Sequence, residues 1–194
     1  MSPPATTEYP RSARRRKVVV ISMGAAAAAI GAGFLAAGRS ADGDRGLSFA
    51  SLADARGELE RLRQARTLAS TTAWSWAQTL IHCAQSIEYS MSGFPQMKPA
   101  LFQHTVGAAA IGVFTWRGRM THDLSEPIPG APALDAAAAA GPASERLAAS
   151  MDAFLHWPGP LRPHFAYGAL ARAQYEQAHA LHLANHLSAF RIEA

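Results

Sequence analysis

Residues 75–92 read Ser-Trp-Ala-Gln-Thr-Leu-Ile-His-Cys-Ala-Gln-Ser-Ile-Glu-Tyr-Ser-Met-Ser. The stretch opens with a capping box, because Ser75 is followed three residues later by Gln78 and each side chain can bond the other's backbone N–H. It stops at Gly93 and Pro95, two residues that commonly end helices. On a helical wheel its apolar side chains share one sector, and a second sector beside it is polar. The stretch therefore predicts one helix of a packed, all-helical domain.

The polar sector of this helix is centred on His82. Helix faces exposed to solvent ordinarily carry charged residues, but this sector has no Lys, Arg, Asp or Glu. We interpret it as the lining of a cavity rather than as ordinary solvated surface. Its other members are neutral hydrogen-bonding residues: Gln78, Gln85, Ser86 and Tyr89.

Helical spacing of apolar residues recurs along the rest of the chain, and no stretch shows the alternation typical of a strand. The segment at 98–115 is rich in Ala and Gly, which predicts close packing, and Ser144 is expected to cap the helix that it begins. The irregular segment 118–143 is rich in Pro and Gly. The expected fold is all-α, an up-and-down four-helix bundle over residues 45–194. The further helices are expected at 49–65, 98–115, 144–156 and 168–191.

The last of these helices places three histidines on one face. His179, His182 and His186 share the side that carries Leu183 and Phe190, which should point into the bundle. Burial of several imidazoles is unfavourable unless each has a polar partner. A metal ion, hydrogen bonds within the protein or water in a cavity could provide that partner. His182 and His186 are one turn apart and able to reach one ion. With His82 supplied from across the bundle, three neutral ligands would leave positions open for water or substrate.

The N-terminal region has the features of an export leader. Arg15 and Arg16 lie in a basic cluster, and an uncharged run rich in Ala and Gly follows as far as Gly38. The arginine pair resembles the twin-arginine motif, which predicts recognition by the twin-arginine translocation machinery. We expect residues 1–44 to comprise a signal peptide or membrane anchor and a short linker. The leader is either cleaved after Gly38 or retained, with residues 18–37 as the anchor; both outcomes place the domain beyond the cytoplasmic membrane, in the periplasm or cell envelope.

The net charge of +4 does not indicate a nucleic-acid partner. Residues 1–38 hold five basic residues and one acidic residue, so the remainder of the chain has 13 of each. A nucleic-acid-binding body needs a surplus of cations. The single cysteine, Cys83, excludes an intrachain disulfide, and its apolar setting predicts a buried structural thiol.

These motifs together resemble a family of the DinB/YfiT-like superfamily, the family called domain of unknown function 1569, whose members often carry twin-arginine leaders. The resemblance spans about residues 47–191 and depends on Trp76 and His82 with the residues after them, the turn from Pro163 to Gly168, and His182-x3-His186-Leu187-x2-Phe190. It implies a four-helix bundle that holds a divalent metal, zinc or nickel, on His82, His182 and His186. It also implies a possible homodimer, and a chemistry of hydrolysis or thiol-dependent transfer of an unknown small molecule. Relatives often have a second histidine directly before the last one, where this chain has Asn185.

The leading hypothesis is an exported metal-dependent hydrolase or transferase that uses a metal-activated water or thiol. The alternative is a non-catalytic envelope module without metal, in which the histidines bond within the core. Gln85, Tyr89, His164 and His179 are candidates to line the site. The alternative for His164 is a capping role. For His179, packing is favoured over metal ligation. The remaining histidines, His104, His122 and His156, have ordinary sequence contexts and are assigned no role.

Overall fold

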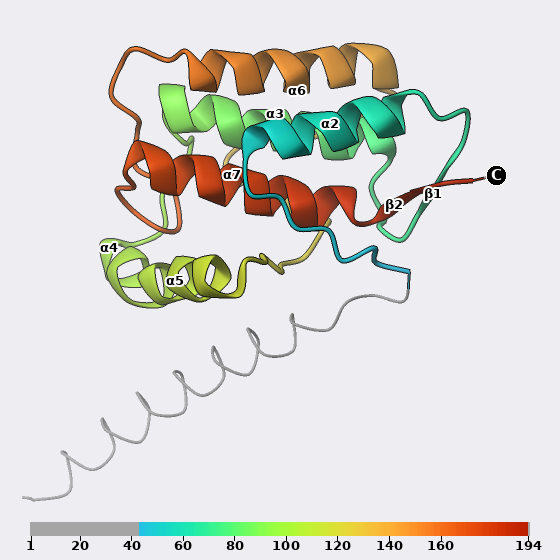
Figure 1. Cartoon of the computed structure of the whole chain (residues 1–194). Helices are drawn as coiled ribbons and strands as arrows, with labels where there is room; N and C mark the ends of the chain where they lie inside the picture. Colours follow the sequence, from blue (N-terminus) through green and yellow to red (C-terminus); the bar gives the residue numbers. More distant parts are fainter. Residues whose placement is uncertain (1–42, 194) are drawn as a thin grey trace, which may run out of the picture. The chain divides into compact units, whose positions relative to one another are not determined.

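The computed structural model describes residues 43–193, and these residues form a mostly helical structure (Figure 1). The leader features, including Arg15, Arg16 and the expected anchor at 18–37, lie outside the described residues. Among the described helices, none is both long enough and apolar enough to cross a bilayer. The elements are α2 (Leu52–Arg63), β1 (Leu68–Ser70), α3 (Trp76–Ser92), α4 (Ala100–Phe102), η1 (Gln103–Gly107), α5 (Ala108–Arg117), α6 (Ala140–Leu155), α7 (Arg172–Leu187) and β2 (Phe190–Ile192).

The main core lies between α2, α3, α6 and α7. Helix α3 packs on α6 and α7, and α2 packs on the same two helices. Each contributes a stripe of apolar side chains at helical spacing, as the sequence predicts. Fully buried members of this core include Leu59, Leu80, Leu147, Phe154 and Leu187.

Helix α3 begins and ends as predicted. The Ser75 hydroxyl accepts a hydrogen bond from the Gln78 N–H (3.2 Å), and the Gln78 side-chain oxygen accepts one from the Ser75 N–H (3.0 Å). Gly93 ends the helix with φ of 110°, a backbone region that favours glycine. Cys83 is fully buried within this helix, and burial raises the pKa of its thiol. The interpretation of Cys83 as a buried thiol is confirmed.

The segment expected as a helix at 98–115 is helical from Ala100 to Arg117, with a π-helical turn (η1) between α4 and α5. This arm lies beside α7 in Figure 1, and Ala110 and Phe114 pack on Leu181. The π-turn brings Gly107 against the loop before α7: a Cβ added at Gly107 would lie 1.8 Å from the carbonyl oxygen of Ala166. The close packing predicted from the Ala and Gly content is thus found at Gly107.

Gly107→Ala is expected to destabilise the domain, because the added methyl group meets backbone rather than a movable side chain. Overpacking of this kind costs about 1–3 kcal/mol. Gly112→Ala is the matched control: no atom lies within 4 Å of its added Cβ. Relative to glycine, alanine there should stabilise helix α5 by roughly 0.5–1 kcal/mol. Urea unfolding measures both, and equal effects of the two substitutions would contradict the close contact at Gly107.

The end of the chain forms a strand, so the expectations of no strand and of a helix as far as 191 are wrong. Helix α7 ends at Leu187, and β2 pairs antiparallel with β1, with Ser70 opposite Phe190. Phe190, expected on the helix face, instead packs its ring on Trp76 at 4.9 Å. Each strand has three residues, which is too short for an alternating pattern to be recognised.

Helices α6 and α7 each begin four residues away from the expected position. Helix α7 begins at Arg172 rather than at 168, because Gly168 has φ of 75° and its backbone pairs with His164 instead. Helix α6 begins at Ala140, so Ser144 is buried inside the helix and does not cap it. Pro142 is compatible with this earlier start, because the first turn of a helix needs no backbone donor from it.

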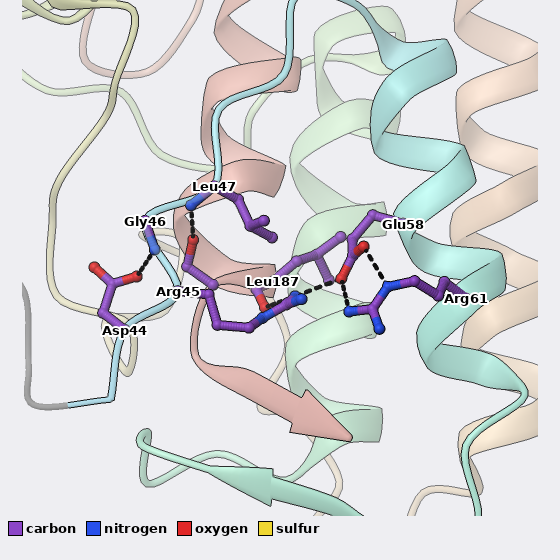
Figure 2. A network of polar contacts seen from close by, with 8 residues as sticks. Asp44, Arg45, Gly46, Leu47, Glu58, Arg61 and Leu187 are labelled. Atoms are coloured by element: carbon purple, nitrogen blue, oxygen red, sulfur yellow. Dashed lines mark hydrogen bonds and ion pairs between the residues drawn. The ribbon is translucent and has the colours of Figure 1, made fainter. Parts of the chain in front are cut away.

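The segment 44–47, where the expected linker passes into the expected bundle, is hydrogen-bonded to the end of α7 (Figure 2). Arg45 donates to the carbonyl of Leu187 (3.0 Å), and the Leu47 N–H donates to the Ser188 hydroxyl (2.9 Å). Glu58 of α2 pairs with Arg45 and also with Arg61. Burial disfavours the Glu58 carboxylate, but hydrogen bonds from both arginines outweigh it and lower its pKa. The network ties the chain's entry into the domain to the residues that directly follow His186.

Candidate metal centre

Two helices bring the three predicted ligands together. His82 lies in the second turn of α3, while His182 and His186 lie one turn apart near the end of α7. Each of the three offers a ring nitrogen, and these nitrogens all lie within 4.8 Å of one another. His82 and His186 are buried and His182 is half-buried. The three histidines could therefore hold a metal ion, as the sequence predicts.

The spacing within this group fits coordination. The Nε2 atoms of His82 and His182 are 3.3 Å apart. Two nitrogens on a tetrahedral zinc ion are separated by about 3.3–3.4 Å, since zinc–nitrogen bonds measure roughly 2.0–2.1 Å. The same distance would suit a hydrogen bond between the rings, with one as donor and the other as acceptor.

Burial keeps the three imidazoles neutral. It lowers the pKa of His82 to about 3, with a smaller contribution from His122. It also lowers the pKa values of His182 and His186 well below the ordinary value, and neighbouring imidazoles lower them further. A neutral imidazole has a lone pair for a metal ion, whereas a protonated one does not.

Several ring nitrogens at this site have no hydrogen-bond partner among the described protein atoms. Both nitrogens of His186 and Nδ1 of His82 are buried and unpaired. Unpaired buried polar atoms are uncommon and energetically costly. Coordination would satisfy one nitrogen of His186, while the Nδ1 of His82 lacks the carboxylate or carbonyl acceptor that commonly orients a metal-binding histidine.

His122 is a fourth histidine at the centre, and the sequence interpretation missed it. Its ring is stacked on His182, with centroids 5.1 Å apart, and meets the edge of His186 at 5.0 Å. His122 lies in the irregular segment between α5 and α6, where no periodicity relates it to the other three. Apart from the high number of histidines in the chain, nothing in the sequence indicated a role for His122.

The hydrogen bond of His122 assigns its tautomer. Its Nδ1 lies 2.8 Å from the carbonyl oxygen of Asp123, which can only accept. Burial lowers the pKa of His122, against the opposing effects of that hydrogen bond and of the Glu126 and Asp123 charges. The neutral ring therefore carries its proton on Nδ1, and Nε2 is left as an acceptor.

An indole covers another side of the centre. Trp74, in the segment before α3, lies 4.9 Å from the His82 ring and is stacked nearly parallel to His186 at 6.3 Å. The histidines are thus bordered by an apolar ring as well as by His122. Such a border limits the access of water to the centre.

His164 and His179 form a separate aromatic cluster with Tyr167 and Tyr175. His164 is stacked on Tyr167 at 4.2 Å, and its Nδ1 accepts hydrogen bonds from the Ala166 and Tyr167 N–H groups. His179 is stacked on Tyr175 and meets Phe154 edge-on. Burial lowers the pKa of both histidines to about 3. His164 thus bonds loop N–H groups before α7, which begins at Arg172, and His179 packs among aromatic rings.

The other two proposed lining residues, Gln85 and Tyr89, both lie on α3. Tyr89 packs on Phe94, which in turn meets His164, so Tyr89 lies with the aromatic cluster. Gln85 is buried on α3, and Gln78 of the same polar sector bonds the Leu134 carbonyl (3.4 Å). The polar sector is thus largely covered rather than solvated. His104 and His156 are exposed.

A family model described as "protein of unknown function (DUF1569)" matches residues 41–193. No curated protein matches the chain, and no solved structure does. The match includes every residue of the histidine centre and the network at residues 44–47.

Proposed function

Since the chain belongs to the DUF1569 family, whose function is not assigned, we propose that it is an exported metal-binding protein of the DinB/YfiT-like type. Helices α2, α3, α6 and α7 would form the up-and-down bundle of that superfamily. His82, His182 and His186 would hold a divalent ion such as zinc or nickel. The reaction would be hydrolysis or thiol-dependent transfer on a small molecule.

One observation carries this proposal: three neutral ring nitrogens from two helices lie within 4.8 Å of one another, and two of them are separated by 3.3 Å. The sequence separation between His82 and His182 is 100 residues, so their juxtaposition depends on how α3 packs against α7. The unpaired nitrogens of His186 add support, because buried imidazoles without partners are unfavourable.

The donor set favours a reactive rather than a structural site. Three protein ligands leave a tetrahedral ion one open position, whereas structural zinc sites have four. Neutral ligands leave the charge of the ion uncompensated, and an ion so held can lower the pKa of bound water to about 7 or activate a thiol. Beyond the three ligands, the unprotonated Nε2 of His122 offers a hydrogen-bond acceptor at this centre.

We assign His122 a positioning role at the open position. Its ring is stacked nearly parallel to His182, with 19° between the rings, but His122 is not a member of the three-histidine group that could hold the ion. A hydrogen bond from water or a substrate hydroxyl to Nε2 suits this arrangement. Trp74 would exclude bulk water from the same region.

The export part of the proposal is supported by the sequence before the domain. The arginine pair and the uncharged run precede the first residue matched by the family model, residue 41. The twin-arginine route carries folded chains, so the metal could be inserted before export.

The experiment that tests the proposed function is metal analysis of the purified full chain, followed by assays of the metal-loaded protein. Chromogenic esters with and without added thiol distinguish hydrolysis from thiol transfer. Metal-dependent turnover supports the proposal. A chain that binds no metal, or melts at the same temperature with and without chelator, would instead support the envelope binding module.

His122→Ala is expected to retain one ion per chain, because the three ligands remain. Loss of a group next to the ligands reduces metal affinity by at most about 100-fold. The catalytic activity of the variant should fall further, by about 10²–10⁴-fold. The visible spectrum of the cobalt-substituted protein checks the first point. A changed coordination geometry in the variant would identify His122 as a ligand and refute its positioning role.

A further inference from the structure

Exposed apolar side chains gather on the arm formed by α4, η1 and α5. Among the described residues, six large hydrophobic side chains are markedly exposed, and four of these lie between residues 97 and 116. Trp116 is 84% exposed and Leu101 is 77% exposed. The other two are Met97 (42%) and Val113 (46%).

This outer face of the arm carries no charge. Residues 99–116 contain no Lys, Arg, Asp or Glu, although a helix at a protein surface ordinarily has charged residues on its outer face. The inner face is already used, since Ala110 and Phe114 pack on Leu181. The outer positions between the large side chains are small or polar and exposed: Thr105, Ala108, Ala109, Gly112 and Thr115. An uncharged, exposed patch of this kind marks an interaction surface.

The ends of the arm carry cations. Lys98 precedes α4 and lies over the Phe102 ring, and Arg117 is exposed next to Trp116. An apolar face with a tryptophan near its edge and basic residues at its ends is typical of helices that lie in the membrane interface. Basic residues there are attracted to anionic lipid headgroups.

The entry of the chain into the domain is adjacent to the same arm. Asp44 forms an ion pair with Arg119, and the Ser48 hydroxyl donates to the Gly118 carbonyl (2.8 Å). The uncharged stretch expected to be an anchor ends at Gly38, six residues before Asp44. Six residues span at most roughly 20 Å. An anchor retained at residues 18–37 would therefore hold the Trp116 end of α5 close to the lipid surface.

We propose that the outer face of α4, η1 and α5 lies against the outer leaflet of the membrane, an inference that rests on the proposed export and on the alternative in which residues 18–37 are retained as an anchor. Tethering lowers the cost of this contact, because the domain already has a high effective concentration at the surface. The contact would orient the domain with the arm toward the lipid. In Figure 1, α6 lies on the side of the helical body away from α5, so it would face the aqueous side.

The test uses the full chain in vesicles of phosphatidylethanolamine and phosphatidylglycerol. Ala109→Cys places a thiol on the outer face of α5, and Ala153→Cys places one on the exposed side of α6 as the matched control. Native Cys83 is fully buried, so an environment-sensitive fluorophore should label only the introduced thiol. The label at 109 is expected to shift to the blue, resist quenching by iodide and be quenched by brominated lipid, while the label at 153 does none of these.

Trp116→Gln added to the Ala109→Cys chain should reduce the blue shift, with the helix content unchanged by circular dichroism. Three results would overturn the proposal. The first is that iodide quenches the labels at 109 and 153 equally. The second is that two copies crosslink through the thiol at 109 in the absence of vesicles. The third is that only chains lacking residues 1–38 are recovered from cells, which would mean that the anchor is not retained.

Discussion

Wild-type protein is expected to carry one divalent ion per chain, and His182→Ala protein is expected to carry none under the same conditions. His182 contributes one of three neutral donors, and two imidazoles alone do not complete the three-ligand set of a catalytic zinc site. An ion present at 100 times its dissociation constant stabilises the folded state by about 2.7 kcal/mol. For a domain of this size, that free energy raises the melting temperature by roughly 5–10 °C.

The measurement is thermal melting with chelator, with zinc and with nickel, combined with elemental analysis. In wild type the ion should raise the melting temperature, and chelator should reverse the change. The shift should vanish in His182→Ala. His104→Ala is the matched control, because His104 is exposed and belongs to the arm rather than to the centre. Equal metal content in wild type and His182→Ala would refute the three-histidine site.

Local chemistry made much of the helical structure predictable. The reciprocal bonds of Ser75 and Gln78 depend only on residues three apart, so the start of α3 could be located from the sequence. His182 and His186 were grouped for a similar reason, since the helix itself places them one turn apart. The pairing with His82 required the additional expectation that the polar sector of α3 faces α7, which came partly from the family resemblance.

The features that were missed depend on tertiary contacts. His122 comes from a segment without regular structure, and only the packing of that segment against α7 brings it to His182. Phe190 continued the helical spacing of α7, but backbone pairing with β1 determines its conformation. At Gly168, the pairing with His164 and the positive φ outweigh an otherwise helical context. Sequence periodicity contains none of this information.

Acid is expected to unfold the metal-free domain well above the pH at which its carboxylates protonate. Burial lowers the pKa of His82, His164 and His179 from 6.5 to about 3. Between these values the unfolded chain binds protons that the folded chain excludes, so stability is full above pH 6.5 and is lost as the pH falls. Each such group costs about 2 kcal/mol between pH 7.5 and 5.0, and three cost about 6 kcal/mol. Domains commonly have a total stability of roughly 5–15 kcal/mol.

Urea unfolding in the presence of chelator, at pH values from 7.5 to 5.0, measures this loss. His179→Phe should reduce the loss by about 2 kcal/mol, because it removes one buried titrating group. Phenylalanine also suits the site: the ring of His179 lies between Tyr175 and Phe154, and its Nε2 is buried without a partner. His156→Gln is the matched control, since it removes an exposed histidine and none of the buried ones. If stability proves constant down to pH 5, the buried histidines must bind protons in the folded state, and their assignment as neutral ligands and packing groups would be wrong.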